Sequence, residues 1–248
     1  MRLRLVACAL VALPALLRAQ ATHKFPPDSL ENVDVIPRST PVQQVLGTMR
    51  GFAGALGVRC SHCHVGEEGK PLTTYDFPSD DKTPKDIARQ MMRMVAEINR
   101  RLDTLPDREP EGLQVTCMTC HRGYVRPVPL ATLMTETAAA SGLDSATRAY
   151  RALRTRYYGS DAFNFSERSL NEAALRLARD QHPAEAAGML ALNEEFYPSA
   201  ASIASARGSI ALLQGDTTAA RAAFREALRR DPNDREAQGR LRDLGERP

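Results

Sequence analysis

Two short segments of this chain carry the same arrangement of cysteine and histidine. Residues 60–64 and residues 117–121 both read Cys-x-x-Cys-His, and they lie 57 positions apart. Two thiols at this spacing reach two vinyl groups of one porphyrin, and the next residue places an imidazole on the iron. The repeated motif therefore predicts two covalently attached c-type haems. The residues that would bind them are Cys60, Cys63 and His64 in the first motif and Cys117, Cys120 and His121 in the second.

Residues 1–21 have the composition of a secretory signal peptide. A basic start, Met1–Arg4, precedes an apolar stretch from Leu5 to Leu17 and an Ala-Gln-Ala cleavage site. We therefore expect an exported, periplasmic protein, with association at the outer face of the cytoplasmic membrane as a further option. An uncleaved membrane anchor is the alternative, although the apolar stretch is short for a span. A lipoprotein signal ending at Cys8 is disfavoured, because the apolar stretch continues beyond that cysteine.

The cysteine count favours haem over other cysteine chemistry. Cys8 lies in the signal segment, and the other four of the five cysteines all belong to the two motifs. No thiol is left for a disulfide, although disulfides are common in exported proteins. A zinc site would need four ligands from paired Cys-x-x-Cys units, so it would form here only if the two motifs met. Export and motif together therefore favour covalent haem.

The charge of the chain gives no sign of a nucleic-acid partner. The formal net charge is +3, and the three arginines among residues 1–21 account for all of it. The mature chain is therefore close to neutral, without the basic footprint of a nucleic-acid-binding protein. Between the motifs, Lys70, Lys82 and Lys85 would suit the steering of an acidic redox partner to a haem edge. A plain solvated loop is the alternative for these lysines.

A helix is expected before each motif. The Thr-Pro pairs at Thr40 and Thr83 predict helix starts, with the threonine as cap and the proline in the first helical position. The apolar residues that follow recur at the helical period, up to Gly57 in the first helix and Leu102 in the second. Each half thus consists of a helix, a connection and a motif. We therefore expect residues 22–130 to form a small all-α dihaem cytochrome domain.

Beyond residue 130 the composition changes to an Ala-, Arg- and Leu-rich sequence without lysine. We expect a linker at residues 131–144 and an all-α domain of antiparallel helical hairpins at residues 145–248. Alignment on Pro198 and Pro232 superposes two Ala-rich helix pairs with a period of 34 residues, and a final helix would cover residues 234–244. This period resembles that of tetratricopeptide repeats. Such a region would serve as a scaffold or would bind a protein partner, and the sequence leaves both open.

Methionine is the abundant candidate for the sixth iron ligand, because few histidines lie outside the motifs. Met49 lies on the first expected helix, and Met91 and Met94 share the apolar face of the second. A methionine on such a face is commonly a core residue, so the residues alone leave the ligand open. The ligand matters for function, since methionine raises the reduction potential whereas an open position permits gas or peroxide chemistry.

The second helix and the second motif resemble the cytochrome c subunit of photosynthetic reaction centres. The resemblance lies in residues 88–99, ARQMMRMVAEIN, and residues 115–123, VTCMTCHRG, and more loosely across residues 35–128. Family members carry an axial methionine on the helix before each motif, which implies Met49 for the first iron and Met91 for the second. Complete members carry four haems in two paired halves. This chain thus resembles a dihaem, half-length relative that is fused to a repeat region.

Together these features predict an exported dihaem electron carrier that is not an enzyme. The resemblance implies electron donation to a membrane-bound reaction centre, and a small electron carrier is another candidate partner. A dihaem peroxidase-like enzyme is the alternative if one iron keeps an open sixth position. A third alternative is a haem-bearing module in which the repeat region captures a protein partner.

Overall fold

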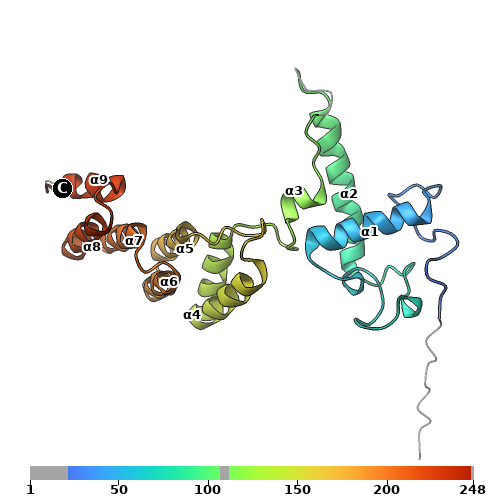
Figure 1. Cartoon of the computed structure of the whole chain (residues 1–248), viewed down its shortest axis with the longest axis horizontal. Coiled ribbons are helices and arrows are strands. Elements are labelled where there is room, and N and C mark those ends of the chain that lie inside the picture. Colours follow the sequence, from blue (N-terminus) through green and yellow to red (C-terminus); the bar gives the residue numbers. More distant parts are fainter. Residues whose placement is uncertain (1–21, 107–111, 247–248) are drawn as a thin grey trace, which may run out of the picture. The chain divides into compact units, whose positions relative to one another are not determined.

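The described part of the chain is helical throughout. The structure, a computed structural model, describes residues 22–106 and 112–246. One isolated antiparallel bridge joins Val65 and Asp76. The predicted all-α class is confirmed, while the predicted signal peptide lies outside the described residues. The elements are α1 (Val42–Leu56), the 3-10 turns η1 (Cys60–His62) and η2 (Leu72–Thr74), α2 (Thr83–Leu102), α3 (Cys117–His121), α4 (Leu130–Tyr157), α5 (Glu167–Arg179), α6 (Pro183–Phe196), α7 (Ala201–Leu213), α8 (Thr217–Arg230) and α9 (Arg235–Asp243) (Figure 1).

The described residues divide into two compact units. Unit 1 comprises residues 22–53, 58–106 and 112–115, and unit 2 comprises residues 54–57 and 116–246. Unit 1 therefore holds the first motif, and unit 2 holds the second motif together with every helix from α3 to α9. This division falls before the second motif, whereas the composition predicted a domain boundary near residue 130.

Proline sets the start of both helices in unit 1. α1 begins directly after Pro41, whose carbonyl accepts the Val45 amide at 3.1 Å. α2 already includes Thr83, and its N-cap is Lys82, which makes no side-chain capping bond. The predicted threonine cap of this helix is therefore wrong. The helix starts one residue earlier because the Lys85 amide bonds to the Lys82 carbonyl, and a proline in the first turn needs no amide partner.

Gly57 ends α1, as the sequence predicts. Its φ of +65° lies in the left-handed region, and a Cβ at this position would lie 2.0 Å from the carbonyl oxygen of Gly123. The Gly123 amide in turn donates to the Ala55 carbonyl at 2.8 Å. Only glycine combines this backbone conformation with such a close approach. The junction, which lies within unit 2, ties the last turn of α1 to the residues that follow the second motif.

Unit 1 has little apolar interior of its own. Among its described residues, only Val45 and Tyr75 are buried apolar side chains. α2 has no buried residue, and Ile87 and Met94 on its apolar face are 54% and 52% exposed. The helical period of this face was predicted correctly, but the face does not pack into a protein core. An amphipathic helix normally buries its apolar face, so this face is suited to a non-protein group.

Unit 2, in contrast, has a continuous apolar core. α5, α7 and α9 begin at Glu167, Ala201 and Arg235, and α6 and α8 begin at Pro183 and Thr217, so the helix starts recur every 34 residues. Successive helices pair as antiparallel hairpins (Figure 1). Their buried faces form two apolar clusters, one extending from α4 to α7 and one from α7 to α9. The period is the predicted one, while the kinship with tetratricopeptide repeats stays a prediction.

Residues 131–144, which were predicted to be a linker, are helical. They form the first half of α4, and Ala131, Met134 and Ala138 are buried in the core of unit 2. α4 changes direction at Gly142, where φ of 78° and ψ of 168° interrupt the helical geometry. The composition explains the difference, because alanine has the highest helix propensity and its small side chain allows close packing.

Candidate functional site

The first motif forms a tight turn directly after α1. Its backbone is held by a bond from the His64 amide to the Cys60 carbonyl at 3.0 Å. Both thiols are free, with Cys60 exposed and Cys63 half-buried. Burial raises the pKa of the Cys63 thiol above its ordinary value. The turn thus presents two thiols and one imidazole within five residues.

The imidazole of His64 is oriented by a backbone carbonyl. Its Nδ1 lies 3.2 Å from the carbonyl oxygen of Phe77, and the Phe77 ring stands edge-on to the imidazole at a centroid distance of 4.9 Å. A hydrogen on Nδ1 that donates to this carbonyl leaves Nε2 as the nitrogen with a free lone pair, which is the usual arrangement of a metal-ligating histidine. Burial, and then the nearby Lys85 ammonium, lower the pKa of His64 and favour the neutral ring.

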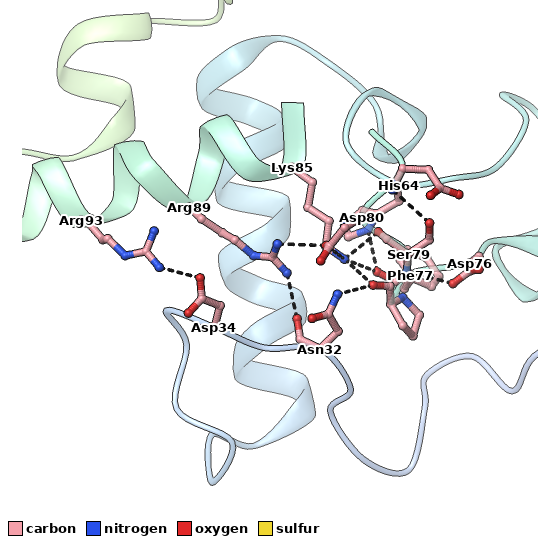
Figure 2. Close-up of polar contacts among 12 residues, drawn as sticks. Asn32, Asp34, His64, Asp76, Phe77, Ser79, Asp80, Lys85, Arg89 and Arg93 are labelled. Carbon is pink, nitrogen blue, oxygen red and sulfur yellow. Dashed lines mark hydrogen bonds and ion pairs between the residues drawn. The ribbon is translucent and has the colours of Figure 1, made fainter. Parts of the chain in front are cut away.

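Lys85 holds the loop that carries the Phe77 carbonyl. Its Nζ donates to the carbonyl oxygens of Phe77, Pro78 and Ser79 at 2.9, 2.8 and 2.8 Å, and lies 3.1 Å from a carboxylate oxygen of Asp80 (Figure 2). The Lys85 side chain is only 12% exposed. The suggested role of this lysine in steering a redox partner is therefore wrong, because its charge is used inside unit 1. Lys82 is also engaged, since it donates to the carbonyl of Ser61.

A second layer of polar contacts ties the N-terminal segment to this loop. Arg89 lies 2.9 Å from Asp80 and donates to the Asn32 carbonyl at 3.0 Å (Figure 2). The Asn32 amide donates to the Pro78 carbonyl at 2.5 Å. The Asn32 side chain and then the Lys85 ammonium lower the pKa of Asp80 to about 2. Asp80 is therefore ionised at neutral pH.

The second motif is a short helix with its own cap. α3 begins after Thr116, which forms a capping box with Thr119, and the Thr116 amide donates to the Thr119 hydroxyl at 3.0 Å. The motif histidine repeats the arrangement of the first one: His121 Nδ1 lies 3.1 Å from the carbonyl oxygen of Tyr124. Burial raises the pKa of the Cys117 thiol. Both motifs therefore present two thiols and an imidazole whose Nδ1 faces a carbonyl.

Tyr124 is fixed by aromatic rings of unit 2 instead of by charged groups. Its ring lies 4.9 Å from that of Phe163 and 5.9 Å from that of Tyr157, in both cases edge to face. Further edge-to-face contacts link these rings to the core of α4 to α6. We call this set the aromatic cluster; it consists of Tyr124, Tyr150, Tyr157, Phe163, Phe165 and Phe196.

The Asn99 side chain of α2 bonds to the backbone of Val115, two residues before the second motif. The Asn99 amide donates to the Val115 carbonyl at 2.9 Å, and the Val115 amide donates to Asn99 Oδ1 at 2.8 Å. This pair of bonds satisfies both backbone groups of Val115, a residue that has no helical partner. The two predicted methionines lie on the helices before the motifs, Met49 on α1 and Met91 on α2, and each is half-buried.

The donor set of each motif fits a c-type haem. Two thiols three residues apart and an imidazole with an oriented Nε2 are the groups that such a haem takes from the protein. The exposed apolar face of α2 fits the same assignment, because a porphyrin presents a large apolar surface. Within the described ranges, no helix is both long and apolar enough to cross a membrane.

Sequence reasoning missed the structural roles of several residues of the site. For Lys85, its position in the sequence was a signal that could have been used. It is the third residue of α2, where a cation is disfavoured by the helix dipole unless other groups stabilise it. The capping box of α3 is visible as Thr-x-x-Thr around the second motif. Asn32 had no local signal, since its partners are far from it in the sequence.

Comparison with known proteins agrees with the site. Residues 19–212 match the family model of the photosynthetic reaction centre cytochrome c subunit. The chain is also similar to cytochrome c-554 of Chloroflexus aurantiacus, with 33% identity over 91 residues, which is 36% of this chain and 20% of that relative. The shared stretch thus spans only a fifth of the relative's length. Because the family match covers well over half of the chain and both motifs, the chain belongs to the photosynthetic reaction centre cytochrome c subunit family, whose members are electron carriers with covalently bound haem c.

Proposed function

We propose that this protein is an exported dihaem cytochrome that carries single electrons between redox partners in the periplasm. One haem is attached through Cys60 and Cys63 with His64 as axial ligand, and the other through the second motif. The observation that carries the proposal is the shared geometry of the motif histidines, each with Nδ1 at 3.1–3.2 Å from a backbone carbonyl oxygen. The residues of the second site are Cys117, Cys120 and His121.

The sixth ligands in this proposal are Met49 for the first iron and Met91 for the second. Membership of the family supports both assignments, because the notable feature of the family is an axial methionine on the helix before each motif. Their position on α1 and α2 and their half-buried side chains are compatible with this role. Two thioether ligands would give both irons a filled coordination shell, which suits electron transfer better than substrate chemistry.

When bound, each haem supplies an iron that alternates between Fe(III) and Fe(II). The chain contributes the rest. Phe77 and Tyr124 orient the two imidazoles through their carbonyls, and the apolar face of α2 would shield a bound porphyrin from water. A rigid ligand set keeps the geometry similar in the two oxidation states, so little reorganisation opposes the transfer of an electron.

The partner we propose is a membrane-bound reaction centre, with a small electron carrier on the other side of the reaction. The family name supports this choice. The helical hairpins of residues 145–248 would then be free to contact a protein partner, in the way that tetratricopeptide repeats do.

Haem stoichiometry and ligation test the proposal. The protein, matured with its haems, should contain two haems per chain, and both should be low-spin with the weak red-region band of sulfur-ligated iron. Met49→His and Met91→His should each remove half of that band. A high-spin iron that binds cyanide rapidly would contradict the carrier and favour the peroxidase-like alternative. A single haem per chain would contradict the dihaem assignment.

A further inference from the structure

The carbonyl that orients His64 is shared between two donors. The Phe77 oxygen lies 3.2 Å from His64 Nδ1 and 2.9 Å from the Lys85 ammonium. Hydrogen bonds from a charged donor are roughly twice as strong as those between neutral groups. The Phe77 oxygen therefore bonds more strongly to the ammonium than to the imidazole. The hydrogen bond from the imidazole is correspondingly weak.

The strength of this bond affects the iron through the ligand. A strong hydrogen bond from Nδ1 makes the imidazole more basic, and a more basic ligand stabilises Fe(III). A weak bond has the opposite effect and favours Fe(II). Sharing of the Phe77 carbonyl with Lys85 therefore favours the reduced state of the iron bound by His64.

The charge of Lys85 acts in the same direction. Lys85 and Arg89 share a single carboxylate, Asp80, and are 12% and 14% exposed, and Lys82 donates to the carbonyl of Ser61 inside the first motif. The Lys85 ammonium, whose carboxylate partner is shared with Arg89, therefore places a positive charge beside the carbonyl that His64 faces. A positive potential favours Fe(II), which carries one positive charge less than Fe(III).

The second motif lacks this arrangement. The Tyr124 oxygen accepts from His121 Nδ1 at 3.1 Å, and within the described ranges no lysine or arginine donates to it. Arg122 directly follows His121, Arg126 is paired with Glu136, and Arg156 lies over the Tyr157 ring at 5.0 Å. His121 therefore keeps the whole acceptor strength of its carbonyl.

We infer that Lys85 raises the reduction potential of the haem at the first motif above that of the haem at the second, so that an electron held by the pair rests at the first motif. This inference rests on the proposed dihaem function. Transfer of one electron between the two sites would oxidise Fe(II) at the second motif and reduce Fe(III) at the first, and would move no proton. Lys85 is a positioning residue, since it acts on the iron only through the Phe77 carbonyl and its charge.

Spectroelectrochemical titration of the full-length dihaem protein tests the inference. Lys85→Met should lower the reduction potential at the first motif by about 59 mV. For one electron, this corresponds to a tenfold smaller equilibrium constant for reduction. The potential at the second motif should not move. Lys85→Arg, which keeps the charge and several donors, should restore most of the parent value. The first-motif couple is identified as the one that disappears in a Cys60→Ala/Cys63→Ala protein.

Lys70→Gln is the matched control, because Lys70 is an exposed lysine of the same inter-motif segment and makes no side-chain bond with described residues. Removal of the Lys70 charge should leave the reduction potentials at both motifs unchanged. Equal shifts in the Lys70 and Lys85 variants would overturn the inference, as would an unchanged first-motif potential in a Lys85→Met protein that holds two low-spin haems. If the Lys85→Met protein does not acquire its haems, Lys85→Gln takes its place, because glutamine keeps two hydrogen-bond donors without the charge. The reduction potential at the first motif of that variant then tests the inference. Each of these negative results leaves the haem count and ligation, and so the proposed carrier function, intact.

Discussion

The two motif histidines make the same hydrogen bond, but the carbonyls that receive it are held by different forces. Phe77 lies in a loop that is fixed by the Lys85 ammonium, Asp80 and residues of the N-terminal segment. Tyr124 is fixed by its ring, which packs into the aromatic cluster. An ion network depends on pH and salt and places charge beside the metal, whereas ring packing does neither. The same five-residue motif is thus given two electrostatic environments.

The two units also differ in how they are held together, because only unit 2 has an extensive apolar core. Among its described residues, unit 1 buries only the apolar side chains of Val45 and Tyr75, whereas unit 2 has two apolar clusters along α4 to α9. Burial of apolar surface is the main source of folding free energy, so unit 2 has its own source of stability and unit 1 has little. We expect unit 1 to depend on its haem and on polar contacts.

The largest effect should come from preventing haem attachment at the first motif. In the Cys60→Ala/Cys63→Ala protein, α1, the helix that carries the proposed ligand Met49, would lose the haem against which its apolar face is proposed to pack. The α1 amides should then exchange with solvent at nearly the rate of exposed backbone, because local opening would no longer expose much apolar surface. Hydrogen exchange measured by mass spectrometry resolves this, with α5 to α8 as the internal control whose protection should not change. Full protection of α1 without this haem would show that protein contacts alone hold the helix.

Truncation of the aromatic cluster should give the next largest effect, and it should be specific to the second motif. Phe163→Ala removes a ring that contacts Tyr124, and should destabilise unit 2 by about 3–5 kcal/mol. It should also change the low-spin electron paramagnetic resonance signal of the second haem, because the carbonyl that orients His121 moves. The signal of the first haem should stay the same.

Phe224→Ala is the matched control for this prediction. Phe224 is fully buried in the cluster of α7 to α9, and it has no contact with the aromatic cluster. Its truncation should destabilise unit 2 to a similar extent, as measured by thermal unfolding, without changing either haem signal. A change of the second haem signal in both variants would mean that loss of stability, not displacement of Tyr124, is the cause.

Local patterns predicted much of this molecule, and contacts between distant residues explain what they missed. The end of α1 at Gly57 and the 34-residue period of α5 to α9 were predicted because each depends on a few neighbouring residues. The inward position of Lys85 was not predicted, because its partners are the carbonyls of Phe77, Pro78 and Ser79, and the local sequence pattern does not give the path of the loop that carries them. The helical conformation of residues 131–144 was missed because a change of composition was taken for a boundary, although alanine-rich sequence favours helix.

A smaller effect is expected from the contact between the N-terminal segment and the first-motif loop. Asn32→Ala removes the donor to the Pro78 carbonyl, and should destabilise the loop by about 1 kcal/mol, the net value of one hydrogen bond. Amides of residues 76–82 should then exchange roughly fivefold faster. Glu31→Ala, at the exposed neighbouring position, should not change this rate. If both variants behave alike, the segment is held by its backbone and not by the Asn32 amide.

The smallest effect should be a local dependence on acid that only the first motif shows. The pKa of Asp80 is lowered in the folded state to about 2, below its ordinary value near 4, so its charge stabilises the loop above that ordinary value. As the pH falls from about 4 to about 2, protonation of Asp80 removes the shared partner of Lys85 and Arg89, and the stabilisation is lost. Exchange or limited proteolysis at residues 76–82 should therefore accelerate in this window, relative to the segment around Tyr124. Asp80→Asn should remove the pH dependence and give the faster rate at every pH. Acid acceleration that persists in Asp80→Asn would assign the effect to another carboxylate and would weaken the contrast between a charged and an aromatic support.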